Sequence, residues 1–363
     1  RQLADAGYKL VAPDDEADIY ILNTCTVTHI ADRKCRNWLR QVRLRNPEAL
    51  VAAIGCYSER ARDELSRIDG VNLVLGNEQK SDLLKILSES GYGGSARSRE
   101  ESAASRTRAF IKVQDGCNNF CSYCIVPLVR GREKSVPADG VVGEVERRVA
   151  DGGKEVVITG TEISSYHHDG VNLTGLLERI LVETGVTRLR LSSLQPQEVT
   201  PEFISLWRDE RLCRHFHLSL QSGSDSVLKR MKRRYSTVEY EQAVALIRKA
   251  LPEAAITTDI IVGFPGETDE EFRESYEFCK RMEFARIHVF SYSPRPGTEA
   301  AQMRPRVPDK VKKQRSQQML ALAEESAADF RKRFAGKIML VLWEQQTGGL
   351  WSGLTDNYIR VYK

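Results

Sequence analysis

Three cysteines lie close together near the middle of the chain, at Cys117, Cys121 and Cys124. Three residues separate the first two, and two residues separate the second from the third. Thiolates grouped in this way bind iron–sulfur clusters or zinc. A cubane cluster has four irons, so three thiolates leave one iron open to a further ligand.

The spacing favours a [4Fe–4S] cluster over zinc. Structural zinc needs four ligands, usually as two pairs, and the nearest histidines in sequence are His167 and His168. The amino and carboxylate groups of S-adenosylmethionine can chelate the open iron, and electron transfer then releases a 5′-deoxyadenosyl radical. Tyr123, just before the last cysteine, resembles the aromatic residue that flanks the adenine in radical S-adenosylmethionine proteins.

Residues after the second strand of the same region form a further candidate site. Gly160, Thr161 and Glu162 end that strand, where they can offer backbone and a polar side chain to the methionine amino group. The alternative is an ordinary turn that uses the freedom of glycine.

Two later strand ends suggest contacts with the nucleoside part of the cofactor. Gln221 and Ser222 begin a Gly-Ser turn suited to ribose hydroxyls, although Ser224 alternatively caps a helix. Gly263 and Phe264 begin an open turn against which an adenine can stack.

A basic run follows the fourth strand and includes Arg230, Arg233 and Arg234. We expect it to bind a phosphate or carboxylate of the substrate, and the alternative is a solvated face.

The remaining cysteines divide into two kinds. Cys25 and Cys56 each end a predicted strand, and the carboxyl ends of neighbouring parallel strands are where open α/β sheets bind ligands. They are therefore candidate ligands of a second metal centre, or else buried thiols. Cys35, Cys213 and Cys279 lie in helical or pre-strand segments and are expected to be packing residues.

Alternating strands and helices position these residues, and they predict an α/β protein. Apolar runs at residues 18–23, 50–55 and 71–76 alternate with helical patterns at 33–44, 59–66 and 81–89, which indicates a parallel sheet. Later candidate strands, with helical patterns between them, are at 110–113, 155–159, 188–192, 215–220, 256–262 and 286–292. Six such units suggest a partial (β/α)6 barrel, whose active site lies on the loops that follow the strands.

Composition shifts predict the domain boundaries. Residues 91–108 are rich in Gly, Ser and Arg and read as a linker, and residues 309–334 read as a long helix. Residues 337–363 predict a small β-domain with a turn at Gly348 and Gly349, whose last strand, 357–363, lacks a partner. The expected domains are residues 1–90, 109–335 and 336–363, on either side of the linker.

The composition is that of an ordinary globular protein. The chain has 363 residues, 41% of them hydrophobic, and a formal net charge of +4, which permits a nucleic-acid partner without requiring one. We expect neither a membrane span nor a signal peptide, and a reducing cytoplasmic setting for the thiols. Since the sequence starts at Arg1, we also expect part of the N-terminus to be missing.

Taken together, these motifs resemble the methylthiotransferase family of radical S-adenosylmethionine enzymes. The segments that carry the resemblance span nearly the whole chain: residues 23–28, 55–57, 114–127, 130–131, 218–224, 258–268 and 292–298. Within the family, residues 107–110, 117–120 and 190–194, followed by Pro196, are most similar to the branch that acts on N6-threonylcarbamoyladenosine in tRNA. The resemblance also adds Ser193 to the expected cofactor-binding residues.

The resemblance implies two [4Fe–4S] clusters and S-adenosylmethionine as cofactors. Cys25 and Cys56 match two of three auxiliary-cluster ligands, and the third family cysteine lies upstream of this sequence. The implied fold is an auxiliary-cluster domain, a radical-SAM barrel and a C-terminal RNA-binding β-domain of the TRAM type, here residues 336–363. The implied enzyme transfers a sulfur-containing group.

The implied reaction adds a methylthio group to adenine C2 of threonylcarbamoyladenosine next to the anticodon. A single-stranded anticodon loop can present one base, as such chemistry requires. The expected partners are tRNA and an electron donor such as flavodoxin or ferredoxin, without DNA or membrane. Alternatives are a methylthiotransferase for isopentenyladenosine tRNA or a ribosomal-protein aspartate, and a non-catalytic iron–sulfur or RNA-binding module.

Overall fold

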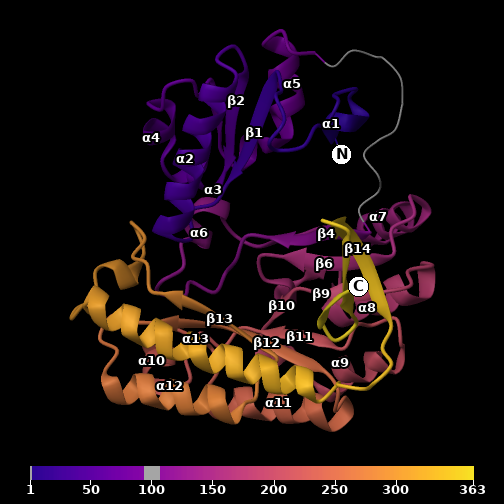
Figure 1. The fold of residues 1–363 in the computed structure, drawn as a ribbon, viewed down its shortest axis with the longest axis vertical. Helices are drawn as coiled ribbons and strands as arrows, with labels where there is room; N and C mark the ends of the chain where they lie inside the picture. The colour runs from indigo at the N-terminus through magenta and orange to yellow at the C-terminus, as the bar shows by residue number, and fades with distance from the viewer. Residues whose placement is uncertain (1, 94–106) are drawn as a thin grey trace. The chain divides into compact units, whose positions relative to one another are not determined.

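The computed structural model describes residues 2–93 and 107–363. The chain forms two compact units, each built from separate segments (Figure 1). The first comprises Arg1–Ser105, Cys124–Gly131 and Ser293–Thr298, and the second comprises Arg106–Tyr123, Arg132–Tyr292 and Glu299–Lys363. Residues 94–106 of the predicted linker lie outside the described residues.

The first unit contains the three-stranded parallel sheet predicted for the N-terminal region. Its strands are β1 (Ile19–Thr24), β2 (Leu50–Gly55) and β3 (Leu73–Leu75), in that order. Its helices are α1 (Gln2–Asp5), α2 (His29–Arg45), α3 (Cys56–Arg60), α4 (Arg62–Ser66), η1 (Glu78–Asp82), α5 (Leu83–Glu89) and α6 (Val126–Arg130). The helix predicted over residues 59–66 is therefore two short helices. Ala61 lies between them, and its φ of −142° is not helical.

Both faces of this sheet are covered, as parallel sheets require. Val51 of β2 packs in one core with Leu39 of α2. Its neighbours Leu50 and Ala52 point to the opposite face, where they pack with Leu87 of α5. The continuous apolar run of β2 is the sequence signature of such a doubly covered strand.

The second unit contains the six predicted strand–helix repeats. The parallel strands are β4 (Arg108–Asp115), β6 (Glu155–Gly160), β9 (Leu189–Leu191), β10 (Ser193–Leu194), β11 (His215–Leu218), β12 (Ala255–Val262) and β13 (Arg286–Ser291). They form two sheets, β5-β4-β6-β9 and β10-β11-β12-β13, in which the short β5 (Lys134–Ser135) runs antiparallel to β4. Ser192 separates β9 from β10, and no closed barrel forms among the described strands.

Helices follow the strands and flank the sheets (Figure 1). They are α7 (Ala138–Ala150), α8 (Leu173–Glu183), α9 (Pro201–Ser205), α10 (Asp225–Arg230), α11 (Thr237–Ala250), α12 (Asp269–Arg281) and α13 (Asp309–Lys332). Capping boxes formed by Ser236 with Glu239, and by Thr268 with Glu271, begin α11 and α12. A small hairpin, β7 (His167–His168) and β8 (Val171–Asn172), precedes α8. None of the described helices has the length and apolar character needed to cross a membrane.

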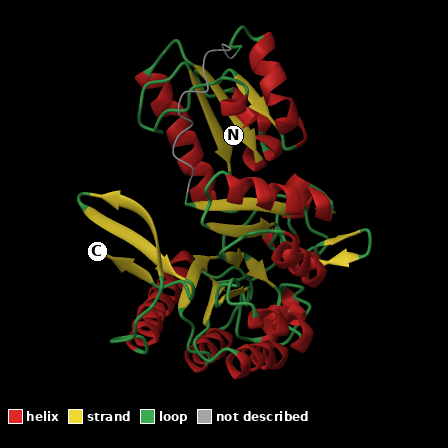
Figure 2. Cartoon of the chain, turned by 90° about the vertical axis from the view of Figure 1, so that its right-hand side faces the viewer, coloured by secondary structure: helices red, strands yellow, loops and turns green. Residues whose placement is uncertain are grey.

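A three-stranded antiparallel sheet ends the chain. Its strands are β14 (Val341–Thr347), β15 (Leu350–Thr355) and β16 (Arg360–Tyr362), and β14 and β15 form the long hairpin seen in Figure 2. The predicted turn at Gly348 and Gly349 is confirmed. The expectation that the last strand lacks a partner is wrong, because β16 pairs with β15.

Buried charges attach this sheet to the first residues of the parallel strands. Glu155, fully buried at the start of β6, accepts hydrogen bonds from Arg188 and Arg190. Arg190 also donates to the carbonyl of Thr355 over 3.1 Å, and the ring of His215 stacks on that of Tyr358 with centroids 4.2 Å apart. These contacts leave the carboxyl ends of the strands for the candidate site.

Candidate functional site

The three-cysteine loop begins where β4 ends. Cys117 and Cys121 belong to the second unit, and Cys124 begins a segment of the first. All three are partly exposed thiols that form no disulfide. The backbone N–H of Asn119 lies 3.4 Å from the Cys117 sulfur, and burial raises the pKa of this thiol. Three partly exposed thiols at this spacing in the sequence are a donor set that fits an iron–sulfur cluster with one open iron.

Buried Ser122 fixes this loop within the second unit. Its N–H donates to the carbonyl of Met231 over 3.1 Å, and its hydroxyl donates to the carbonyl of Arg230 over 2.8 Å. Its own carbonyl accepts from the N–H of Ala300 over 2.8 Å. The loop that bears Cys121 is thus tied to the chain that follows α10.

Arg233 connects the cysteine loop to two other strand ends. Its Nη1 lies 3.3 Å from the Cys121 sulfur, and its Nη2 donates to Oε1 of Gln195 over 2.5 Å. Its Nε donates to the hydroxyl of Tyr235. A guanidinium in this position can donate to a thiolate and stabilise its charge. Substrate binding by Arg233 stays a prediction, and its side chain already has these partners.

Glu162 is a buried acidic residue near the cysteine loop. It is 8% exposed, and one carboxylate oxygen accepts from Nε2 of Gln195 over 2.5 Å and from Nδ2 of Asn119 over 3.5 Å. Its other oxygen, Oε1, has no hydrogen-bond partner. Burial raises the pKa of this carboxyl. An unsatisfied carboxylate oxygen of this kind fits an ammonium group.

The two residues before Glu162 have structural roles. A Cβ on Gly160 would lie 2.8 Å from the carbonyl oxygen of Gln114, so only glycine allows β6 to approach β4 this closely. The hydroxyl of Thr161 donates to Asp115 over 3.0 Å. Ser193 is half-buried in β10, the strand that follows β9 along the chain.

Hydrogen bonds to β12 and α12 hold the loop after β11 in place. Gln221 adopts a φ of 68°, its N–H donates to the Asp259 carbonyl over 2.8 Å, and its carbonyl accepts from Ile261. The hydroxyl of buried Ser222 lies 2.9 Å from that of Ser275. Ser224 is the residue before α10 but makes no side-chain cap bond to it.

The loop after β12 presents an aromatic cluster beside the cysteine loop. Phe264 is fully buried, and the ring of Tyr123 meets it edge-on with centroids 6.4 Å apart. The N–H of Gly263 donates to Glu267 over 2.7 Å, and Glu267 in turn pairs with buried Arg315 over 2.6 Å. The Tyr123 ring is thus positioned by a loop that internal hydrogen bonds hold in place.

The predicted basic run does not form a single patch. Arg230 pairs with Glu271 over 2.7 Å, and hydrogen bonds from Arg230 lower the pKa of Glu271 to about 2. Arg233 turns toward Cys121, whereas Arg234 is exposed. Binding of a substrate phosphate or carboxylate by these arginines stays a prediction.

Cys25 and Cys56 lie at neighbouring strand ends of the first unit. Thr24 pairs with Gly55 in the parallel register of β1 and β2, and each cysteine is the next residue. Cys25 is exposed, and Cys56 is 6% exposed as the first residue of α3. Gly55 has a φ of 104°, a conformation that glycine adopts readily, and it turns the chain there.

Donors surround the sulfur of Cys56. Nε of Arg130 in α6 lies 3.2 Å from it, and Nδ2 of Asn77 lies 3.7 Å away. Ile125 and Val129 complete a small apolar cluster with Cys56. Cys35, Cys213 and Cys279 are buried, as expected of packing residues, and burial raises the pKa of Cys213 to about 12.

Sequence reasoning missed a buried ionic network in the first unit. Arg295 donates to Asp32 over 2.5 Å, and Arg60 donates to the same carboxylate over 3.0 Å. Thr26, the residue after Cys25, donates to Asp32 over 2.7 Å and accepts from Arg60. The network fixes the backbone beside Cys25. The segments 23–28 and 292–298, which include Thr26 and Arg295, were its signals in the sequence.

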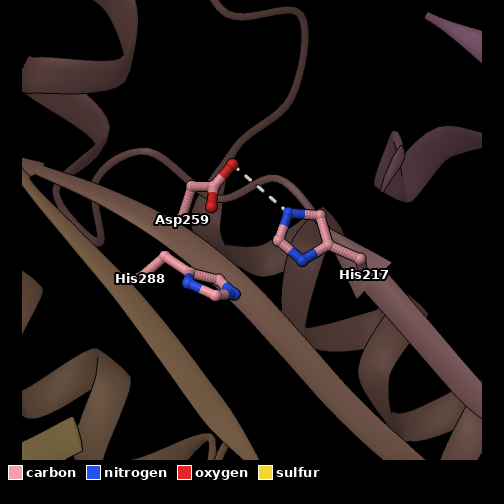
Figure 3. Close-up of side chains that lie close together, drawn as sticks. All are labelled: His217, Asp259 and His288. Atoms are coloured by element: carbon pink, nitrogen blue, oxygen red, sulfur yellow. Dashed lines mark ion pairs between the residues drawn. The ribbon is translucent and has the colours of Figure 1, made fainter. Parts of the chain in front are cut away.

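A second missed group consists of His217, Asp259 and His288, which three successive strands bring together (Figure 3). Each residue alone resembles an ordinary polar residue in a strand, so only the strand register reveals the group.

Known families match both regions of the chain. Residues 111–279 match the Radical SAM superfamily, and residues 1–76 match an uncharacterized protein family, UPF0004. The radical S-adenosylmethionine methyltransferase TsrM of Kitasatospora setae shares the fold, with a TM-score of 0.59 and 17% identity over 79% of this chain and 66% of that one. That likeness bears on the fold alone.

Curated relatives align along nearly the whole chain. The threonylcarbamoyladenosine tRNA methylthiotransferase MtaB of Aquifex aeolicus is 40% identical, and the alignment covers 98% of this chain and 90% of that protein. The enzyme of the same name from Bacillus subtilis is 36% identical, over 98% and 84%. A tRNA-2-methylthio-N(6)-dimethylallyladenosine synthase of Moorella thermoacetica is 35% identical, over 94% and 82%.

The strand-end loops and the family match define the class as radical S-adenosylmethionine enzymes, which use S-adenosylmethionine and a [4Fe–4S] cluster. Within that class, the extent of the alignments decides the family. The chain belongs to the radical-SAM tRNA methylthiotransferases. The resemblance seen in the sequence is confirmed.

Proposed function

We propose that this enzyme adds a methylthio group to adenine C2 of N6-threonylcarbamoyladenosine next to the anticodon of tRNA. The observation that carries the choice of substrate is the set of relatives named for that nucleoside. Those of Aquifex aeolicus, Thermotoga maritima and Bacillus subtilis are 40%, 39% and 36% identical, against 35% for the dimethylallyladenosine synthase of Moorella thermoacetica.

Cys117, Cys121 and Cys124 would hold the radical-generating cluster. When bound, the cluster and S-adenosylmethionine supply the 5′-deoxyadenosyl radical. Arg233 donates to the Cys121 sulfur and places a positive charge beside this ligand.

Other residues bind and orient S-adenosylmethionine. Glu162 has a free, buried carboxylate oxygen for the ammonium group of the methionine moiety. The partly exposed ring of Tyr123, which packs edge-on against buried Phe264, offers an apolar surface for the adenine beside the Gly263 loop. Gln221, Ser222 and Ser193 remain candidates for contacts with the rest of the cofactor.

Cys25 and Cys56 would contribute to a second [4Fe–4S] cluster in the first unit. Their place at adjacent strand ends supports this, as do the hydrogen bonds to Cys56. A third ligand is required and is not assigned. We further propose flavodoxin or ferredoxin as the electron donor, and Arg234 as a contact to the tRNA backbone.

The test is an anaerobic reaction of the reconstituted protein with three substrates. These are tRNA carrying threonylcarbamoyladenosine, tRNA carrying isopentenyladenosine, and a ribosomal protein. We expect the 2-methylthio product with the first alone, detected by mass spectrometry of the digested tRNA. Product from either of the others in its place would assign the chain to another branch of the family.

A further inference from the structure

Three neighbouring parallel strands each bring one metal-binding side chain to the same place. Asp259 of β12 pairs directly with His288 of β13 in the strand register. His217 of β11 pairs with Thr257, two residues before Asp259 and therefore on the same face of the sheet. Figure 3 shows the three side chains converging.

The distances suit ligands of one ion. Nε2 of His217 lies 3.2 Å from Oδ2 of Asp259, and the ligand atoms of all three residues lie within 4.8 Å of one another. Metal–ligand bonds of about 2.0–2.1 Å place neighbouring donors of a tetrahedral site about 3.4 Å apart. The side chains of His217 and Asp259 are 13% and 27% exposed, so an ion can reach them.

A neighbouring hydroxyl orients the first imidazole. Oγ1 of buried Thr257 lies 2.9 Å from Nδ1 of His217 and 3.0 Å from Nε2 of His215. A hydrogen bond to one ring nitrogen directs the other toward a metal, and this is the usual environment of a histidine ligand. In His217 the nitrogen directed in this way is Nε2, which faces Asp259.

A simple ion pair is the competing explanation. The chain contains one for comparison, between His168 and Asp169, whose atoms lie 3.1 Å apart on the exposed β7–β8 hairpin. An ion pair accounts for His217 and Asp259 but gives no role to His288, although the ring centroids of His217 and His288 lie 5.8 Å apart.

We propose that His217, Asp259 and His288 form a binding site for a divalent transition-metal ion such as Zn²⁺ or Fe²⁺. Two imidazoles and one carboxylate suit such ions and leave coordination positions open to water or another oxygen ligand. This site has nitrogen and oxygen donors only, which separates it chemically from the cysteine sites. The proposal does not rest on the substrate proposed above.

The test loads the anaerobically reconstituted full chain, with its iron–sulfur clusters in place, with Co²⁺ as a spectroscopic probe. The wild type is compared with Asp259→Asn, His288→Gln and the second-sphere variant Thr257→Val. His168→Gln is the control. Bound cobalt is measured by equilibrium dialysis, its ligands by the visible spectrum, and iron per chain in every sample.

We expect one equivalent of Co²⁺ with a nitrogen and oxygen ligand spectrum in the wild type and His168→Gln. Asp259→Asn and His288→Gln should lose that equivalent while keeping their iron, and Thr257→Val should bind roughly tenfold to a hundredfold more weakly. Equal binding by all proteins, or only thiolate-to-cobalt bands, overturns the proposal. If the ligand variants do not fold, the wild-type spectrum alone decides between these outcomes.

Discussion

The guanidinium of Arg130 lies 3.2 Å from the sulfur of Cys56, within the first unit. Arg130 ends α6, a short helix that starts two residues after Cys124. Ile125 and Val129, which lie between Cys124 and Arg130 in the sequence, pack on Cys56. The segment 125–130 therefore begins directly after Cys124, the last cysteine of the radical-SAM loop. The same segment packs on Cys56, a candidate ligand of the second cluster.

Replacing Arg130 by Gln should weaken the second cluster and spare the first. A hydrogen bond to a charged group contributes about 1.5–3 kcal/mol, so iron in the first unit should be held roughly tenfold to a hundredfold less tightly. Chemical analysis of iron and sulfide after dialysis measures the loss. The matched control is Arg40→Gln, which changes an exposed arginine of α2 in the same unit and should keep all its iron. Equal iron in both variants would show that Arg130 does not support a cluster.

Replacing Arg233 by Met should change the electronic properties of the first cluster. The N–H group directed at the Cys121 sulfur stabilises negative charge, so its loss should lower the reduction potential of the cluster and slow cleavage of S-adenosylmethionine. A redox titration followed by electron paramagnetic resonance measures the potential. Arg234→Met removes an exposed neighbouring charge and should leave it unchanged. A potential that moves equally in both variants would point to net charge as the cause.

Glu162→Gln should raise the KM for S-adenosylmethionine by about tenfold or more, since a charge-assisted hydrogen bond to the ammonium is lost. The amide keeps the volume of the side chain, and cluster content should not change. Assay of 5′-deoxyadenosine formation at several cofactor concentrations gives the KM. An unchanged KM with a lowered kcat would contradict a binding role.

The same residue predicts a pH dependence. Burial raises the pKa of Glu162, and only its ionised form attracts an ammonium. Binding of S-adenosylmethionine should therefore weaken as the pH falls, beginning at a higher pH than an ordinary glutamate would give. Binding titrations of wild type and Glu162→Gln across this range provide the check, because the variant should show no such dependence from this position.

The Arg230–Glu271 pair predicts a contribution to stability that acid removes. The pKa of Glu271 is lowered from 4.5 to about 2, first through its hydrogen bonds with Arg230. A depressed carboxyl pKa stabilises the fold above the unfolded value and loses that contribution as the pH falls from 4.5 toward about 2.

Glu271→Gln should therefore lower the free energy of unfolding near neutral pH by about 1–2 kcal/mol, an estimate discounted for the exposure of the pair. The difference from wild type should shrink below pH 4.5, as thermal unfolding at a series of pH values can show. Glu270→Gln removes an exposed pair with Arg273 on the same helix and should have little effect. A difference that does not vary with pH would contradict the linkage.

Local patterns predicted the elements well. The bounds of β2 coincide with the predicted range 50–55, because a continuous apolar run marks this strand. A capping box at Thr268 similarly marks the start of α12. The spacing of the three cysteines, likewise, is a local property of one loop. Such features depend on neighbours in sequence, and the sequence displays them directly.

Contacts between distant segments could not be predicted in this way. Asp32 and Arg295 are 263 positions apart, and the sequence around each residue does not predict their contact. His217, Asp259 and His288 come together through the relative register of three strands, which the separate strand patterns leave undetermined. Likewise, the partners of Arg230 and Arg233 in the basic run, Glu271 and Gln195, lie far away in the sequence and meet them only in the fold.

The most direct test of the central claim is the nucleoside composition of tRNA from a strain that lacks this enzyme and is complemented with it. Mass spectrometry should find 2-methylthio-N6-threonylcarbamoyladenosine with the wild-type chain. With Cys121→Ala it should find only the unmodified threonylcarbamoyladenosine, since two thiolates cannot hold the cluster. The methylthio nucleoside in the uncomplemented strain, or at wild-type level with Cys121→Ala, would contradict the account.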